Sequence, residues 1–169
     1  NSYRNPTNLL EAYSSFHQNN KTVLRFIGLD LTPEKLDELS TKYPNVDFIP
    51  MVSQEDSYKY MLQSDVLINM HTTKDLSSKF LIGGKLFDYY RSKRFILSIN
   101  SSESFEHEFV NEKKIGMCIE NNNYEILKAI NLIYQKWESN GNLINKLKDE
   151  ELSSYSRKYF NNKLLQLLQ

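Results

Sequence analysis

Short apolar runs alternate with segments of helical periodicity along this sequence, and that alternation limits its fold more than any other feature. The apolar runs are "TVLRFIG", "VDFIPMV", "DVLINM", "RFILSI" and "IGMCIE". They are largely continuous rather than alternating apolar and polar residues, which is typical of strands buried on both faces of a parallel sheet. Helical segments separate them, as crossover connections between parallel strands require. We therefore predict an α/β fold with a Rossmann-like, doubly wound parallel sheet over residues 1–169.

The helical segments carry recognisable start and stop signals. Side chains that accept a backbone N–H bond are typical of helix starts, and proline favours the first turn. We predict N-caps at Asn5, Thr32, Ser53 and Ser101 or Ser102, the last opening an acidic helix through Glu112, and two final helices separated near Asn140–Gly141. Such folds usually begin with a central strand, whereas this sequence opens on a helix. We therefore expect the first strand to be missing or to lie upstream, in a fragment of a larger protein.

Charge and cysteine content exclude several classes of function. Lys+Arg and Asp+Glu both number 21, and this balance argues against a general nucleic-acid binder. The single cysteine, Cys118, excludes an intrachain disulfide and a cysteine-based metal cluster, and its apolar neighbours indicate a buried structural thiol. No two histidines have metal-ligand spacing, so we expect no metal, and His17 and His107 are interpreted as surface residues. Without a membrane-spanning run or a signal peptide, a cytoplasmic location is expected.

The stretch "FLIGGKLFDYY" suggests an anion-binding site. Gly83 and Gly84 directly precede a helix that follows a long loop after the predicted strand "DVLINM". In parallel α/β sheets, ligands bind beyond the carboxyl ends of the strands, and a helix N-terminus with close backbone approach favours an anion. Lys85 in the first turn opposes the helix dipole, a conflict that an anion would resolve, and Asp88 one turn later suits sugar hydroxyls. An ordinary turn and a solvated lysine are the alternative interpretation.

A family resemblance makes this interpretation more specific. "GGKLFDYYRSKRFILSI" closely resembles the segment G-K-L-F-E-Y-L-A-x-G-K-P-I-L of retaining glycosyltransferases of the GT-B fold, the group 1 family. The segments "RNPTNLLEAY", "VDFIPMVSQEDSYKYMLQSDVLINM", "KKIGMCIENNN" and "YFNNKLLQLL" resemble other parts of the same domain in the same order. The resemblance implies the C-terminal, donor-binding domain, which takes a nucleoside diphosphate sugar and needs no metal or other cofactor.

The resemblance also implies roles for individual residues. The assignments are diphosphate contacts from Arg4, Gly83, Gly84 and Lys85, a ribose contact from Asp88, and base contacts from Ile49, Pro50, Met51 and Val52. His71 follows a predicted strand, where it would contact donor phosphate or sugar, or alternatively satisfy the loop by hydrogen bonding. Catalytic residues remain unassigned, because the acceptor-side domain that would hold them is absent.

One departure from the family pattern keeps alternatives open. Phe80 stands where the family's E-x7-E motif has its first glutamate, and Asp88 stands in place of the second glutamate. The full enzyme is expected to transfer a hexose-type sugar to a glycan or lipid acceptor, as in bacterial polysaccharide biosynthesis, with peripheral association at the inner face of the membrane left open. The alternatives are a nucleotide-sugar epimerase of the same fold and a degenerate, non-catalytic interaction domain. A receiver-like module would need an acidic cluster that the strand ends lack.

Overall fold

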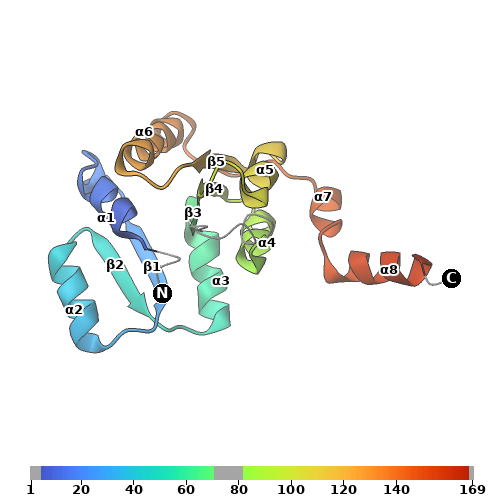
Figure 1. The fold of residues 1–169 in the computed structure, drawn as a ribbon, viewed down its shortest axis with the longest axis horizontal. Helices are drawn as coiled ribbons and strands as arrows, with labels where there is room; N and C mark the ends of the chain where they lie inside the picture. The colour runs from blue at the N-terminus through green and yellow to red at the C-terminus, as the bar shows by residue number, and fades with distance from the viewer. Residues whose placement is uncertain (1–4, 71–81, 168–169) are drawn as a thin grey trace.

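The computed structural model describes residues 5–70 and 82–167, in which strands and helices alternate (Figure 1). The strands are β1 (Leu24–Leu29), β2 (Val46–Pro50), β3 (Val66–Met70), β4 (Phe95–Ile99) and β5 (Gly116–Ile119). The helices are α1 (Thr7–Ser14), the short 3-10 helix η2 (Asn19–Lys21), α2 (Pro33–Lys42), α3 (Gln54–Gln63), α4 (Gly84–Arg91), α5 (Phe105–Glu112), α6 (Asn123–Asn140), α7 (Asp149–Ser153) and α8 (Arg157–Leu167). All five predicted strands are confirmed.

The strands are parallel, as predicted, but they form two sheets. β1 pairs with β2, with Leu24 opposite Val46, and the second sheet has the order β3-β4-β5. In the second sheet, Val66 lies opposite Phe95 and Ile96 opposite Gly116. Within the described residues, β1 and β3 are therefore both edge strands. The fold is α/β and Rossmann-like. Its two described sheets are separate because β1 and β3 do not pair with each other.

Local capping follows the sequence at two helices and departs from it at a third. Thr32 accepts from the Lys35 N–H at the start of α2, and Ser53 accepts from the Asp56 N–H at 3.0 Å at the start of α3. The predicted cap at Ser101 or Ser102 is wrong, because Ser104 caps α5 by accepting from the His107 N–H at 3.2 Å.

The displaced cap of α5 has a visible physical reason. The Ser101 N–H is already bonded to Asn100 Oδ1 at 2.7 Å, and the Ser104 N–H closes a turn onto the Ser101 carbonyl at 3.1 Å. The chain therefore turns once after β4 before the helix begins.

The ends of the described chain also differ from prediction. Asn5 accepts from the Thr7 N–H at 3.0 Å, but Pro6 rather than Asn5 occupies the N-cap position of α1. The break at Asn140–Gly141 is confirmed, with Gly141 in the left-handed region at φ 72°. Beyond it lie two further helices instead of one, and α7 and α8 extend away from the rest of the molecule in Figure 1.

One hydrophobic cluster joins the two sheets. It contains Leu24 and Val46 of the first sheet and Leu97 and Ile99 of the second, together with buried residues of α1 and α6. The apolar face of α1 is buried at Leu9, Leu10 and Tyr13, and Phe16, just beyond the helix, is buried beside them. Every residue of β4 is buried, as expected for a central parallel strand.

A second hydrophobic cluster holds α4 and α5 against the second sheet. It combines Leu86 and Tyr90 of α4 with Ile96 of β4 and Phe109 and Val110 of α5. Leu86, Ile96 and Val110 have no exposed surface. The start of α4, with its two glycines, lies near the end of β3, because Gly83 and Asn69 both donate to Glu106. No helix in the described part of the chain has the length and apolar character needed to cross a membrane.

Candidate functional site at the start of α4

The N-terminal end of α4 is presented by a well-packed helix. Leu86 and Tyr90 are buried beneath it, whereas Gly84 and Lys85 in its first turn are exposed. The first N–H groups of any α-helix have no partner within the helix. The backbone amides of Gly84 and Lys85 therefore lie at an exposed helix end, a geometry that favours binding of an anion.

Gly83, the N-cap residue of α4, is held by a carboxylate from the next helix. Its N–H donates to Glu106 Oε1 at 2.9 Å. Glu106 lies in the first turn of α5 and is 1% exposed. A Cβ at position 83 would lie 3.2 Å from the same oxygen. The φ of Gly83 is −65°, which every residue adopts, so the nearness of Glu106 and not backbone strain favours glycine here.

The other oxygen of Glu106 binds the ends of two strands. Oε2 accepts from Asn100 Nδ2 at 2.8 Å, directly after β4, and from Asn69 Nδ2 at 3.0 Å, in β3. Asn100 is 2% exposed, and its Oδ1 accepts from the Ser101 N–H, which determines which side of the amide faces Glu106. One buried carboxylate thus connects β3, β4 and the start of α4. Glu106 was missed from the sequence, where it was only part of an acidic segment.

Asp88 and Lys85 lie on α4 near this end. Asp88 is half-buried and Lys85 is exposed. Among the described residues, no ion pair joins the Asp88 carboxylate to the Lys85 ammonium group. The structure thus brings Gly83, Gly84, Lys85 and Asp88 together on one helix end, as the sequence predicted, and adds Glu106 beneath them.

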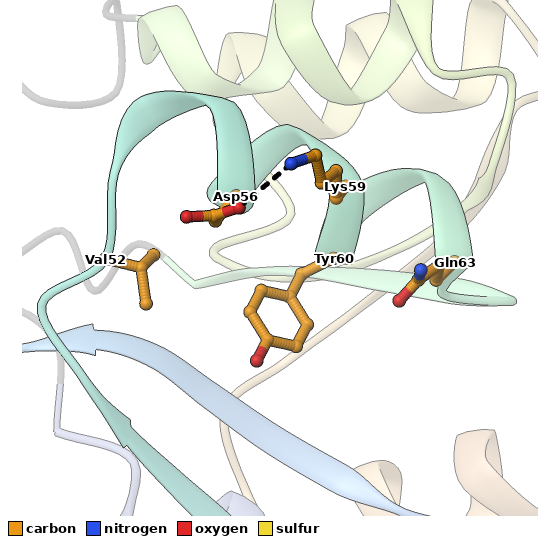
Figure 2. Close-up of a pocket in the computed structure, with 5 residues that line it drawn as sticks. All are labelled: Val52, Asp56, Lys59, Tyr60 and Gln63. Carbon is orange, nitrogen blue, oxygen red and sulfur yellow. Dashed lines mark hydrogen bonds and ion pairs between the residues drawn. The ribbon is translucent and has the colours of Figure 1, made fainter.

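The predicted base-binding segment borders a pocket on α3. Ile49 and Pro50 end β2, Met51 is largely exposed, and Val52 lines a cavity of about 320 Å³. The remaining lining residues come from α3 and are Asp56, Lys59, Tyr60 and Gln63. Figure 2 shows the Val52 and Tyr60 side chains pointing into the same space, with Lys59 paired to Asp56 at 3.2 Å. Of the four predicted base contacts, only Val52 lines this cavity.

Three residues named from the sequence lie outside the described part of the chain. These are Arg4, His71 and Phe80. Their predicted roles in diphosphate or sugar binding therefore stay predictions.

The burial of Cys118, His17 and His107 can be compared with the positions predicted from the sequence. Burial raises the pKa of the Cys118 thiol to about 12, against a smaller lowering by the Ser98 hydroxyl. His17 is exposed as predicted, but the prediction of a surface position for His107 is wrong in part, because its Nδ1 is buried and has no partner within the described residues. Helix α5 lies against β5, and the Cys118 thiol donates to the His107 carbonyl at 3.6 Å. No group of three His, Cys, Asp or Glu side chains in the described regions has the geometry to hold a metal ion.

Comparison with known proteins shows the fold but no sequence family. No family model and no curated protein matches the sequence. Among solved structures, the chain is similar to WaaG, a glycosyltransferase involved in lipopolysaccharide biosynthesis, with a TM-score of 0.60 and 17% sequence identity. The match covers 79% of this chain but 35% of WaaG, so the chain spans about a third of that protein. At this identity the similarity shows the fold, which corresponds to one half of a GT-B fold.

Proposed function

We propose that this chain is the nucleotide-sugar-binding half of a glycosyltransferase, and that the start of α4 holds the donor diphosphate. The observation that carries the proposal is the exposed first turn of α4, where Gly84 and Lys85 present backbone amides and a lysine side chain next to the carboxyl end of β3. A helix N-terminus stabilises negative charge, and so does the lysine ammonium group. Charge that develops on a leaving diphosphate would be stabilised by the same groups.

Asp88 is proposed as the anchor for the ribose. It lies one turn along α4 and is half-buried, so its carboxylate has a restricted position beside the proposed diphosphate site. A carboxylate accepts hydrogen bonds from two neighbouring hydroxyl groups, and holding the ribose would orient the anomeric carbon of the sugar. Gly83 contributes differently from the sequence expectation, because its N–H is bonded to Glu106.

The cavity beside α3 is the proposed place for the base. Val52 belongs to the segment predicted to contact the base, and Tyr60 adds an aromatic ring to the same space. A flat base would stack on such a ring or lie against it edge to face. Ile49, Pro50 and Met51 would then supply backbone contacts at the rim rather than side chains in the cavity.

The whole enzyme is proposed to need more than these residues. β1 and β3 are both edge strands in the described structure, and a strand from another part of the protein would join them into one sheet. A separate domain would bind the acceptor, a glycan or a lipid, and supply the catalytic residues. The complete protein would transfer a hexose-type sugar, and this chain alone would bind nucleotide without turnover.

The test is titration of the protein with UDP, GDP and ADP by calorimetry, followed by the same titrations of two alanine variants. Asp88→Ala and Lys85→Ala should each weaken binding of the preferred nucleotide about tenfold, the loss expected for one charge-assisted hydrogen bond. Asp37→Ala on α2 and Lys158→Ala on α8 are matched controls, because both residues are exposed. Absence of binding to all three nucleotides at millimolar concentration would refute the proposal, and undiminished binding by Asp88→Ala would refute the ribose assignment.

A further inference from the structure

We propose that Glu106 is a positioning residue for the diphosphate site, acting through the backbone of Gly83. This inference rests on the proposed function, because it concerns the first turn of α4. Glu106 would touch neither the nucleotide nor the sugar. It would set the position of the N-cap residue and so the direction of the Gly84 and Lys85 amides.

The contacts of Glu106 use both oxygens of its carboxylate. Burial of a carboxylate is costly unless hydrogen bonds compensate it, and an apolar side chain of similar size would pack into the second hydrophobic cluster at lower cost. Here both oxygens accept bonds from neutral N–H groups, at 2.9 Å from Gly83, 2.8 Å from Asn100 and 3.0 Å from Asn69. These bonds tie α4 to two strand ends rather than reinforcing a single element.

The bond to Gly83 acts at the place where the direction of α4 is decided. Gly83 is the N-cap, and its carbonyl accepts from the Leu86 N–H at 2.9 Å, closing the first turn. Leu86 is fully buried, so the turn is held from below by packing and from its start by Glu106. The two exposed amides lie between these fixed points. Their orientation therefore depends on the Glu106 carboxylate.

Replacement by glutamine separates positioning from simple charge. Glu106→Gln keeps the length of the side chain but puts an NH2 group where one of the oxygens now accepts. Asn100 cannot turn its own oxygen towards that group without losing the Ser101 N–H, since Oδ1 is already bonded there at 2.7 Å. Placing the glutamine oxygen at the two strand ends keeps two bonds and turns the NH2 group towards the Gly83 N–H, so the Gly83 bond is the one that is lost. If Glu106 only repelled the diphosphate, the same change would tighten binding.

The experiment compares Glu106→Gln with Glu108→Gln, a control in the same first turn of α5 whose side chain is exposed. Two ligands are titrated into each folded protein, namely the nucleoside diphosphate that the wild type binds and the corresponding nucleoside. We expect Glu106→Gln to weaken diphosphate binding about tenfold, as for loss of a hydrogen bond to a charged group, and to leave nucleoside binding unchanged. The Gly83 amide resonance should also shift upfield relative to the wild type. Glu108→Gln should change neither.

The outcomes distinguish this inference from the proposed function. Wild-type diphosphate binding with equal or tighter binding by Glu106→Gln overturns the positioning role and leaves the proposed function intact. Equal weakening for diphosphate and nucleoside also overturns it, because that pattern indicates general disturbance of the fold. If the wild type binds no nucleoside diphosphate, both proposals fail.

A measurement on the unaltered protein covers the case in which Glu106→Gln does not fold. The Gly83 amide of the wild type should resonate downfield and exchange slowly with solvent, because it donates to a buried carboxylate. Rapid exchange without a downfield shift would show that the Gly83–Glu106 bond is not maintained, and would overturn the inference.

Discussion

The Gly83 N–H donates a 2.9 Å hydrogen bond to the carboxylate of Glu106, although the two residues lie 23 positions apart. This bond connects the start of α4 to the first turn of α5, across the strand β4 between them. We expect this contact to stabilise the folded protein even without a ligand. Among the described residues, the carboxylate accepts from the Gly83 N–H and from the half-buried Asn69 and buried Asn100 side chains.

Glu106→Ala should destabilise the protein by about 3 kcal/mol, because three N–H donors lose their acceptor in a buried place. Chemical denaturation followed by circular dichroism measures the change in the free energy of unfolding. Glu108→Ala, on the exposed side of the same turn, should change it by less than about 0.5 kcal/mol. Equal effects of the two substitutions would contradict the central place given to Glu106.

Gly116→Ala should be among the most damaging single methyl additions in this chain. A Cβ at position 116 would lie 1.8 Å from the Ile96 carbonyl oxygen, at the first residue pair of the β4–β5 ladder. Ile96 in β4 and Ile115, the residue before β5, are fully buried, so close packing opposes a shift of either segment. The expected loss is about 3 kcal/mol or more, at the upper end for overpacking, and thermal unfolding would detect it. A loss below about 1 kcal/mol would mean that the two strands separate easily there.

Gly84→Ala should move stability and ligand binding in opposite directions. A Cβ at Gly84 meets no atom within 4 Å, and alanine favours the helix, so the folded state should gain up to about 0.5 kcal/mol. The same methyl group would stand where the proposed diphosphate approaches the backbone, and we expect affinity to fall about tenfold. Thermal unfolding and calorimetry on one sample provide both values. Unchanged affinity would place the anion elsewhere.

Ser53→Ala should weaken the start of α3 and change its response to acid. Ser53 accepts from the Asp56 N–H at 3.0 Å and donates to Asp56 Oδ2 at 2.7 Å, and loss of such a cap costs about 1 kcal/mol. The Ser53 hydroxyl is the main cause that lowers the pKa of Asp56 below its ordinary 3.8, followed by Lys59. A lowered folded pKa stabilises the protein above pH 3.8, and this contribution is lost as the pH falls through the folded value.

The measurement for Ser53→Ala is an NMR titration of the Asp56 carboxyl carbon. The pKa of Asp56 should rise towards its ordinary value in the variant, and the loss of stability below pH 3.8 should become smaller. Ser102→Ala, at an exposed turn residue, is the control. A pKa unchanged by Ser53→Ala would show that Lys59 alone lowers it.

Cys118 should be unreactive in the folded protein. Its thiol has a pKa raised to about 12 by burial, so the nucleophilic thiolate is scarce at neutral pH. Ellman's reagent at pH 8 should modify the native thiol at least about a hundredfold more slowly than the unfolded chain, whose thiol has an ordinary pKa of about 8.5. Rapid modification of the native protein would indicate local opening of β5.

Much of the fold was readable from local patterns. The apolar runs located all five strands, and the caps at Thr32 and Ser53 were correct because each acts on an amide three residues away. The N-cap of α5 was predicted at Ser101 or Ser102 instead of Ser104, because Asn100 and Ser101 first form a turn. That turn depends on the position of the end of β4. The break between α7 and α8, at residues 154–156, was not predicted because no glycine or proline marks it.

The candidate site divides in the same way. Spacing along the chain alone predicts that two glycines, a lysine and an aspartate meet at a helix start after an apolar strand. That Glu106 accepts from the Gly83 N–H and that β1 and β3 do not pair depends on how the elements pack in three dimensions. Helical periodicity indicates which face of α5 is apolar. It does not indicate the hydrogen-bond donors of a carboxylate on the buried side, because these come from β3, from the residue after β4 and from the start of α4. The two glycines therefore have different surroundings. A buried carboxylate lies close to Gly83, whereas a Cβ at Gly84 would meet no atom within 4 Å.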